Sequence, residues 1–89
     1  MDVNESINQI NKACKAFGAE KVVLFGSRAK GTALERSDID VAVAGVSDFD
    51  SLQEEIEEIP TLYKIDLVNL DTCRNTLLLE DIREYGREI

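Results

Sequence analysis

Apolar residues at the start of the chain recur at the spacing of an α-helix. Their intervals are three or four residues, which places them in one stripe: Val3, Ile7, Ile10, Cys14 and Phe17. Gly18 follows this stripe, and glycine commonly ends a helix because it adopts left-handed backbone angles. The pattern therefore predicts an N-terminal helix that packs one face on a core.

Shorter apolar runs at 21–25, 38–44 and 63–70 are typical of buried strands, because they are rich in valine, isoleucine and leucine. Between the first two runs we expect a helical turn at 27–31 and then a loop at 32–37. Helical spacing returns between the second and third runs. That helix has these predicted features: an N-cap at Ser47 or Asp48, an inner face of Phe49, Leu52, Ile56 and Ile59, and an end at Pro60.

The remaining sequence completes a small α+β domain. A last helix is expected to start at Asp71 or Thr72 and to carry one stripe: Leu78, Ile82, Tyr85 and Ile89. With 89 residues the chain is predicted to be a single domain, 1–89, with a small core. We expect three or four strands in a mixed sheet packed with helices.

Two aspartates open the second strand in a pattern with chemical meaning. Side chains two apart along a strand share a face, so Asp38 and Asp40 would lie side by side, with Ile39 turned away. Two carboxylates this close repel each other unless positive charge lies between them. Hard oxygen ligands suit Mg²⁺ or Mn²⁺, so the pair indicates a divalent metal site. A solvated strand end would also produce a lone Asp-x-Asp.

The turn after the first strand has the features of a phosphate site. Gly26 allows close backbone approach, and exposed amides at Ser27, where a helical turn begins, attract anions. Arg28 and Lys30 add donors and positive charge, although both could be ordinary solvated cations. Arg36 is interpreted as a loop charge. Together with the aspartates, this turn predicts a site for a metal–nucleoside triphosphate.

This site requires a particular arrangement of strands. The end of the first strand and the start of the second can serve one ligand only if the two strands are antiparallel. In the third strand, Asp66 sits between Ile65 and Leu67, where an unpaired carboxylate is costly. It is either a partner in a structural salt bridge or a third carboxylate facing Asp38 and Asp40, and we prefer the second interpretation.

Composition excludes several other functions. The chain contains no histidine, which excludes Ser-His-Asp and Cys-His catalysis. A net charge of −8 disfavours direct nucleic-acid binding, whereas a local cationic spot suits a small triphosphate. Gly26 to Gly31 resembles the start of a P-loop, but Thr32 stands where that motif requires lysine. Cys14 and Cys73 are expected to be free thiols.

The location expected from sequence is the cytoplasm. No apolar run approaches the roughly 20 residues of a membrane helix. The first twelve residues are acidic and amphipathic, unlike a signal peptide.

The stretch Gly26-Ser27, ten further residues, then Asp38-Ile39-Asp40 resembles the signature of the polymerase-beta-like nucleotidyltransferase superfamily. The longer match, GSRAKGTALERSDIDVAV, is similar to the minimal nucleotidyltransferase group, the antitoxin partners of HEPN-domain toxins. The resemblance implies catalytic and metal-binding roles for Asp38, Asp40 and Asp66, the third acidic residue being common on the strand after the Asp-x-Asp pair. It also implies nucleotide contacts from Gly26, Ser27, Arg28 and Lys30.

The same resemblance implies an activity. A Mg²⁺-dependent enzyme would transfer AMP from ATP to a tyrosine hydroxyl of a HEPN toxin and silence it, in a possible hetero-oligomer. Lys30 stands where many relatives carry arginine, and the chain is shorter than many of them. Two other interpretations are a binding module that neutralises its partner by occlusion, and a transferase acting on a small molecule.

Overall fold

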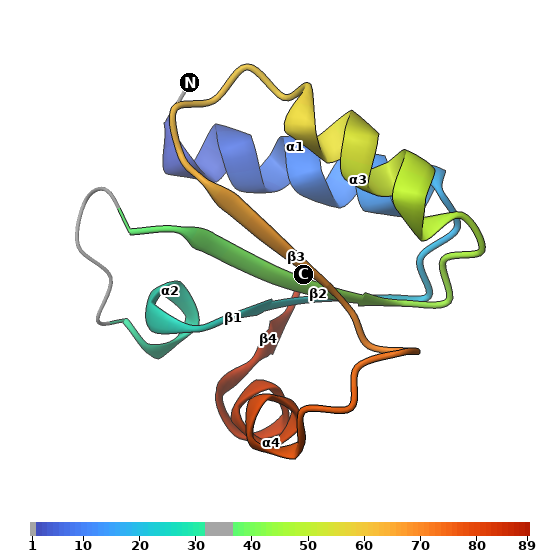
Figure 1. Cartoon of the computed structure of the whole chain (residues 1–89). Coiled ribbons are helices and arrows are strands. Elements are labelled where there is room, and N and C mark those ends of the chain that lie inside the picture. The colour runs from blue at the N-terminus through green and yellow to red at the C-terminus, as the bar shows by residue number, and fades with distance from the viewer. Residues whose placement is uncertain (1, 32–36) are drawn as a thin grey trace.

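The computed structural model describes residues 2–31 and 37–89, so the expected loop charge Arg36 lies outside the described residues. Helices and strands alternate through most of this sequence (Figure 1). Their order is α1 (Val3–Ala16), β1 (Lys21–Phe25), α2 (Ser27–Lys30), β2 (Ile39–Ala44), α3 (Phe49–Glu57), β3 (Ile65–Asn69), α4 (Thr76–Tyr85) and β4 (Arg87–Glu88). No helix in these two ranges is long and apolar enough to cross a membrane.

The strands form one mixed sheet in the order β3-β2-β1-β4. β1 pairs with β2 in antiparallel register, which confirms the predicted strand direction, and Phe25 at the end of β1 lies opposite Asp40 near the start of β2. β2 and β3 are parallel, with Asp40 opposite Asp66. The C-terminal end of β1 and the N-terminal ends of β2 and β3 therefore lie side by side at one end of the sheet.

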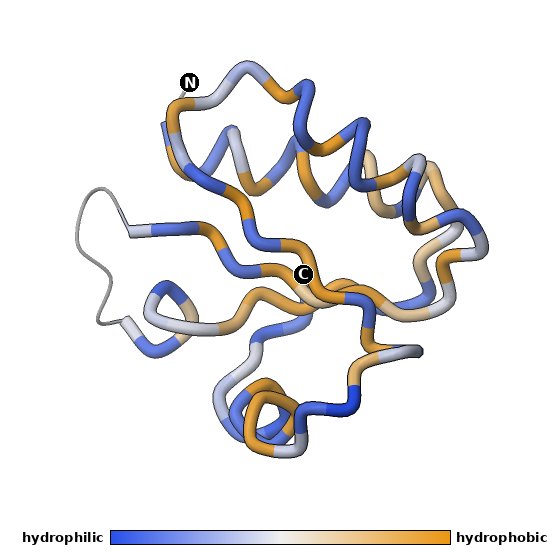
Figure 2. The backbone as a smooth tube through the Cα atoms, viewed as in Figure 1, coloured by the Kyte–Doolittle hydropathy of each residue, from blue (hydrophilic) through white to orange (hydrophobic). Residues whose placement is uncertain are grey.

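Each face of the sheet has its own apolar layer. α1 and α3 lie together over one face, and α4 lies over the other (Figure 1). Alternate residues of β1 divide between the two layers: Val22 and Leu24 pack with α1 and α3, whereas Val23 and Phe25 pack with Ile82 of α4. Figure 2 shows hydrophobic residues concentrated along β1 and β2, as expected for strands covered on both faces.

The C-terminal part differs from the sequence prediction. The prediction that the last helix starts at Asp71 or Thr72 and continues to Ile89 is wrong, because α4 spans Thr76–Tyr85 only. Asn75 is the N-cap, and its side chain accepts a hydrogen bond of 3.2 Å from the Leu78 amide.

Residues beyond α4 form a strand in place of a helix. Gly86 takes extended backbone angles and ends α4. Arg87 and Glu88 then pair with β1 as the fourth strand. This pairing makes a four-stranded sheet, within the predicted range of three or four strands.

Candidate active site

Asp40 and Asp66 form the centre of the candidate site. They are direct neighbours in the parallel β2–β3 pairing. Each alternates along its strand with residues of the α1–α3 layer, such as Val41 and Leu67, so both carboxylates lie on the opposite, α4-facing side of the sheet. Asp66 therefore shares a face with Asp40, as the preferred sequence interpretation requires.

The environment of Asp40 disfavours its charged form. Burial raises the pKa of Asp40 from the ordinary 3.8 to about 6, and a hydrogen bond with Asp66 adds to the rise. The negative charges of Asp66 and Asp38 act in the same direction, whereas the positive charge of Arg28 opposes them. Two adjacent carboxyl groups that disfavour each other's negative charge provide oxygen ligands that suit a divalent cation.

Gly26 brings the turn after β1 against this carboxyl pair. Its φ of +73° lies in the region that favours glycine, and a Cβ atom at this position would collide with Oδ2 of Asp40. Ser27 begins the single-turn helix α2, and the Lys30 amide donates to the Gly26 carbonyl at 3.1 Å. Gly26, predicted for phosphate binding, therefore lies directly beside Asp40, and Ser27 follows it as the first residue of α2.

Arg28 lies near Asp40, and its contacts include a hydrogen bond and an aromatic ring. Its Nη2 donates a hydrogen bond of 2.6 Å to the carbonyl of Ser37, the residue before Asp38. Its Cζ lies 4.9 Å from the centre of the Tyr63 ring, the geometry of a cation–π contact. The positive charge of Arg28 partly offsets the rise in the pKa of Asp40, so the guanidinium lies within electrostatic reach of that carboxyl.

Lys30 points to a different part of the molecule. Its Nζ lies 2.8 Å from Oδ1 of Asp81 and 4.9 Å from the centre of the Tyr85 ring, both on α4. The contact with Asp81 raises the pKa of Lys30 above its ordinary value. Lys30 thus joins α2 to α4, and its predicted contact with nucleotide stays a prediction.

The carboxyl groups that the structure brings together only partly match the predicted metal site of three aspartates. Across 2–31 and 37–89, no three histidine, cysteine, aspartate or glutamate side chains are grouped so that they could hold one ion. Asp38 is half-buried and precedes β2, and its charge raises the pKa of Asp40. The Asp40–Asp66 pair offers adjacent hard oxygen ligands, which fits a divalent cation, and a role for Asp38 beside them stays a prediction.

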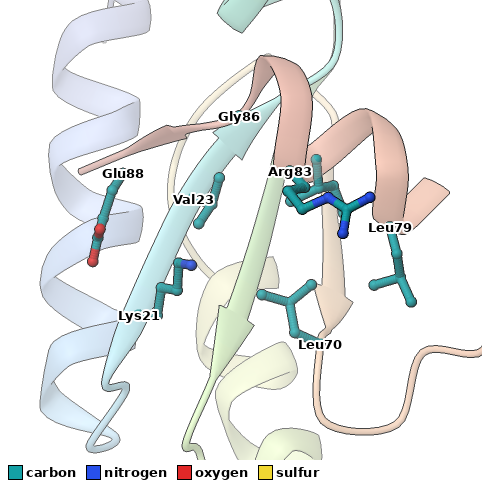
Figure 3. A pocket seen from close by; sticks show the side chains of 8 residues that line it. Lys21, Val23, Leu70, Leu79, Arg83, Gly86 and Glu88 are labelled. Atoms are coloured by element: carbon teal, nitrogen blue, oxygen red, sulfur yellow. The ribbon is translucent and has the colours of Figure 1, made fainter.

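A separate hollow lies under α4, away from the carboxylates (Figure 3). It has a volume of about 340 Å³ and includes Lys21, which pairs with the far end of β2. None of the predicted site residues lines it.

The two cysteines are free thiols, as expected. Burial raises the pKa of the Cys14 thiol to about 11.

Sequence reasoning missed three residues around the site: Tyr63, Asp81 and Tyr85. Each contacts a cation of α2 from a distant part of the chain. Tyr63 lies two residues before the strand that carries Asp66, and this short separation is a local signal that could have indicated it. Asp81 and Tyr85 share a helical face at a spacing of four residues, but nothing in that spacing identifies Lys30 as their partner.

The sequence profile described as "Polymerase beta, Nucleotidyltransferase" matches residues 8–89, which include the whole sheet and the carboxyl pair. The chain belongs to this nucleotidyltransferase family. Comparison with curated proteins gives no significant match.

Several solved structures share the fold. A toxin–antitoxin crystal structure with AMP-PNP is 27% identical, with a TM-score of 0.69 over 91% of this chain and 69% of the other. A variant MntA–HpeT toxin–antitoxin structure is 26% identical, with a TM-score of 0.70 over 93% and 70%.

A third similar structure contains a tri-AMPylated HEPN toxin of Shewanella oneidensis with its MNT antitoxin. It is 22% identical, with a TM-score of 0.64 over 96% of this chain and 69% of the other, and this likeness supports the fold alone.

Proposed function

We propose that this protein is the antitoxin of a HEPN toxin and transfers AMP from ATP to a tyrosine hydroxyl of that partner. The observation that carries the proposal is the Asp40–Asp66 carboxyl pair against the Gly26 turn. Family membership supports nucleotidyl transfer. The similarity to toxin–antitoxin structures, one of them with AMP-PNP, supports both the partner and the nucleotide.

Asp40 and Asp66, with Asp38 beside them, would hold Mg²⁺ or Mn²⁺. Such an ion, when bound, supplies positive charge that offsets the charge of the triphosphate and of the carboxylates. Burial leaves the Asp40 carboxyl poorly solvated, and its hydrogen bond with Asp66 disfavours its charged form further. In that environment, two carboxylates with a bound cation are more favourable than two charged carboxylates without one.

The other groups would act on the triphosphate and the acceptor. In the reaction, the acceptor oxygen forms a bond to the α-phosphorus, the bond to the bridging oxygen breaks, and pyrophosphate leaves. Asp66 would accept the proton from the acceptor hydroxyl. The Ser27 hydroxyl and nearby amides would bind the outer phosphates, and the Arg28 guanidinium would offset charge that develops on them. The rate would come mainly from positioning and electrostatics.

Labelled ATP tests this proposal. The protein would be incubated with Mg²⁺, α-labelled ATP and the HEPN protein encoded beside it, and label would be followed into each polypeptide. We expect label on the HEPN protein and none with Asp40→Ala. A toxin that is fully neutralised by Asp40→Ala, with no label in any sample, would contradict the proposal and support occlusion.

A further inference from the structure

The guanidinium of Arg28 has a defined position beside the carboxyl pair. An arginine side chain has several rotatable bonds, so holding it in one place costs conformational entropy. The contacts of Arg28 include the 2.6 Å hydrogen bond to the Ser37 carbonyl and the Tyr63 ring at 4.9 Å. A hydrogen bond at one edge and a ring against one face together restrict both the place and the tilt of the guanidinium.

The segment that carries Tyr63 is itself anchored on both sides. The Tyr63 amide donates to Oγ1 of Thr61 at 3.3 Å, and that oxygen lies 2.8 Å from Oγ of Ser6, a fully buried residue of α1. On the other side, the Lys64 carbonyl accepts from the Ile39 amide at 2.9 Å. The Tyr63 ring also packs against the α1–α3 core. The ring is therefore a stable surface for a cation.

We infer that Tyr63 is a positioning residue that holds the Arg28 guanidinium where the triphosphate of the proposed function would bind. The inference rests on that proposed function. Arg28 donates to the carbonyl of Ser37, which directly precedes Asp38, the residue before β2, so its placement by Tyr63 sets the positive charge available at the end of the sheet that carries the carboxyl pair. Preorganised charge of this kind increases affinity because less freedom is lost on binding.

The other tyrosine of the chain has a different arrangement. Tyr85 lies 4.9 Å from Lys30, but the ammonium of Lys30 is also bound to Asp81 and joins α2 to α4. Tyr63, in contrast, precedes the strand of Asp66, and its cation contacts the segment that leads into Asp38. Tyr63 is therefore the tyrosine that the geometry connects to the carboxyl site.

The test compares three single variants by calorimetric titration of Mg-ATP. Tyr63→Leu keeps an apolar side chain against the core but removes the ring, and we expect a dissociation constant about 3- to 10-fold higher. Tyr63→Phe keeps the ring, and we expect a change below about twofold. Leu62→Ala removes a neighbouring, fully exposed side chain and serves as the matched control, with no expected change.

A double-mutant cycle with Arg28→Met separates positioning from general support of the fold. If Tyr63 acts through Arg28, Tyr63→Leu has an effect below about twofold when Arg28 is absent. An equal loss with and without Arg28, or wild-type affinity in Tyr63→Leu, overturns the inference. Wild-type protein that binds no Mg-ATP overturns the proposed function as well, so the two failures are distinguishable.

Discussion

Asp40→Asn should make the metal-free protein more stable at neutral pH. The raised pKa of Asp40 means that the folded state holds this proton more tightly than the unfolded state. The resulting stabilisation is fully present below pH 3.8 and is lost as the pH rises through about 6. Above that pH the folded protein contains a charged Asp40 beside Asp66, and asparagine removes this cost while keeping the shape of the side chain.

The size of the effect follows from the rise in pKa and the exposure of the group. A rise from 3.8 to about 6 corresponds to about 3 kcal/mol as an upper limit. Asp40 is only half-buried, and solvent screening reduces this figure to about 1 kcal/mol. For a domain of this size, that difference raises the Tm by about 4–8 °C.

Urea unfolding without divalent cations, at several values between pH 4.5 and 8, measures the difference between Asp40→Asn and wild type. We expect the advantage of the variant to grow from pH 4.5 to about pH 6, the pKa of Asp40 in the folded protein, and to level off at higher pH. Glu55→Gln removes an exposed charge from α3 and is the control, with a change within about 0.5 kcal/mol. A variant no more stable than wild type at pH 8, or an advantage that does not vary with pH, would refute the reasoning.

Three other predictions concern single residues. Gly26→Ala should lower the free energy of unfolding by about 1–3 kcal/mol in urea titrations, because φ is +73° and the new Cβ meets Asp40; unchanged stability would contradict the close approach. Asn75→Ala should cost about 1 kcal/mol by the same measurement, since it removes the cap of α4, and a loss below about 0.3 kcal/mol would exclude that cap. In thiol-labelling assays at pH 8, Cys73 should react well before the fully buried Cys14, whose pKa is about 11; equal rates would contradict the burial.

The sequence predicts the end of the sheet that carries the candidate site, because the patterns that indicate it are local. The apolar run at Lys21–Phe25, the turn at Gly26 and the alternation at Asp38 and Asp40 each depend on a few neighbouring residues. The antiparallel pairing is predicted because the end of the first strand and the start of the second must serve one ligand, and the register of β1 and β2 confirms it. Asp66 was recognised because a carboxylate inside an apolar strand is costly without a partner.

The parts that could not be predicted depend on contacts between distant segments. Arg87 and Glu88 have little strand character of their own and form β4 only because β1 offers an edge. Lys30 was expected at the phosphates, but its ammonium binds Asp81, which is 51 positions further along the chain. The contact between Arg28 and Tyr63 is likewise tertiary, and neither residue type nor spacing indicates it.

The most direct test of the central claim is calorimetric titration of AMP-PNP with and without Mg²⁺ into wild-type protein and Asp66→Asn. The account predicts binding that requires Mg²⁺ in the wild type and is at least about tenfold weaker in the variant, because the carboxyl pair holds the cation that accompanies the triphosphate. Binding of equal strength with and without Mg²⁺, or wild-type affinity in Asp66→Asn, would contradict it.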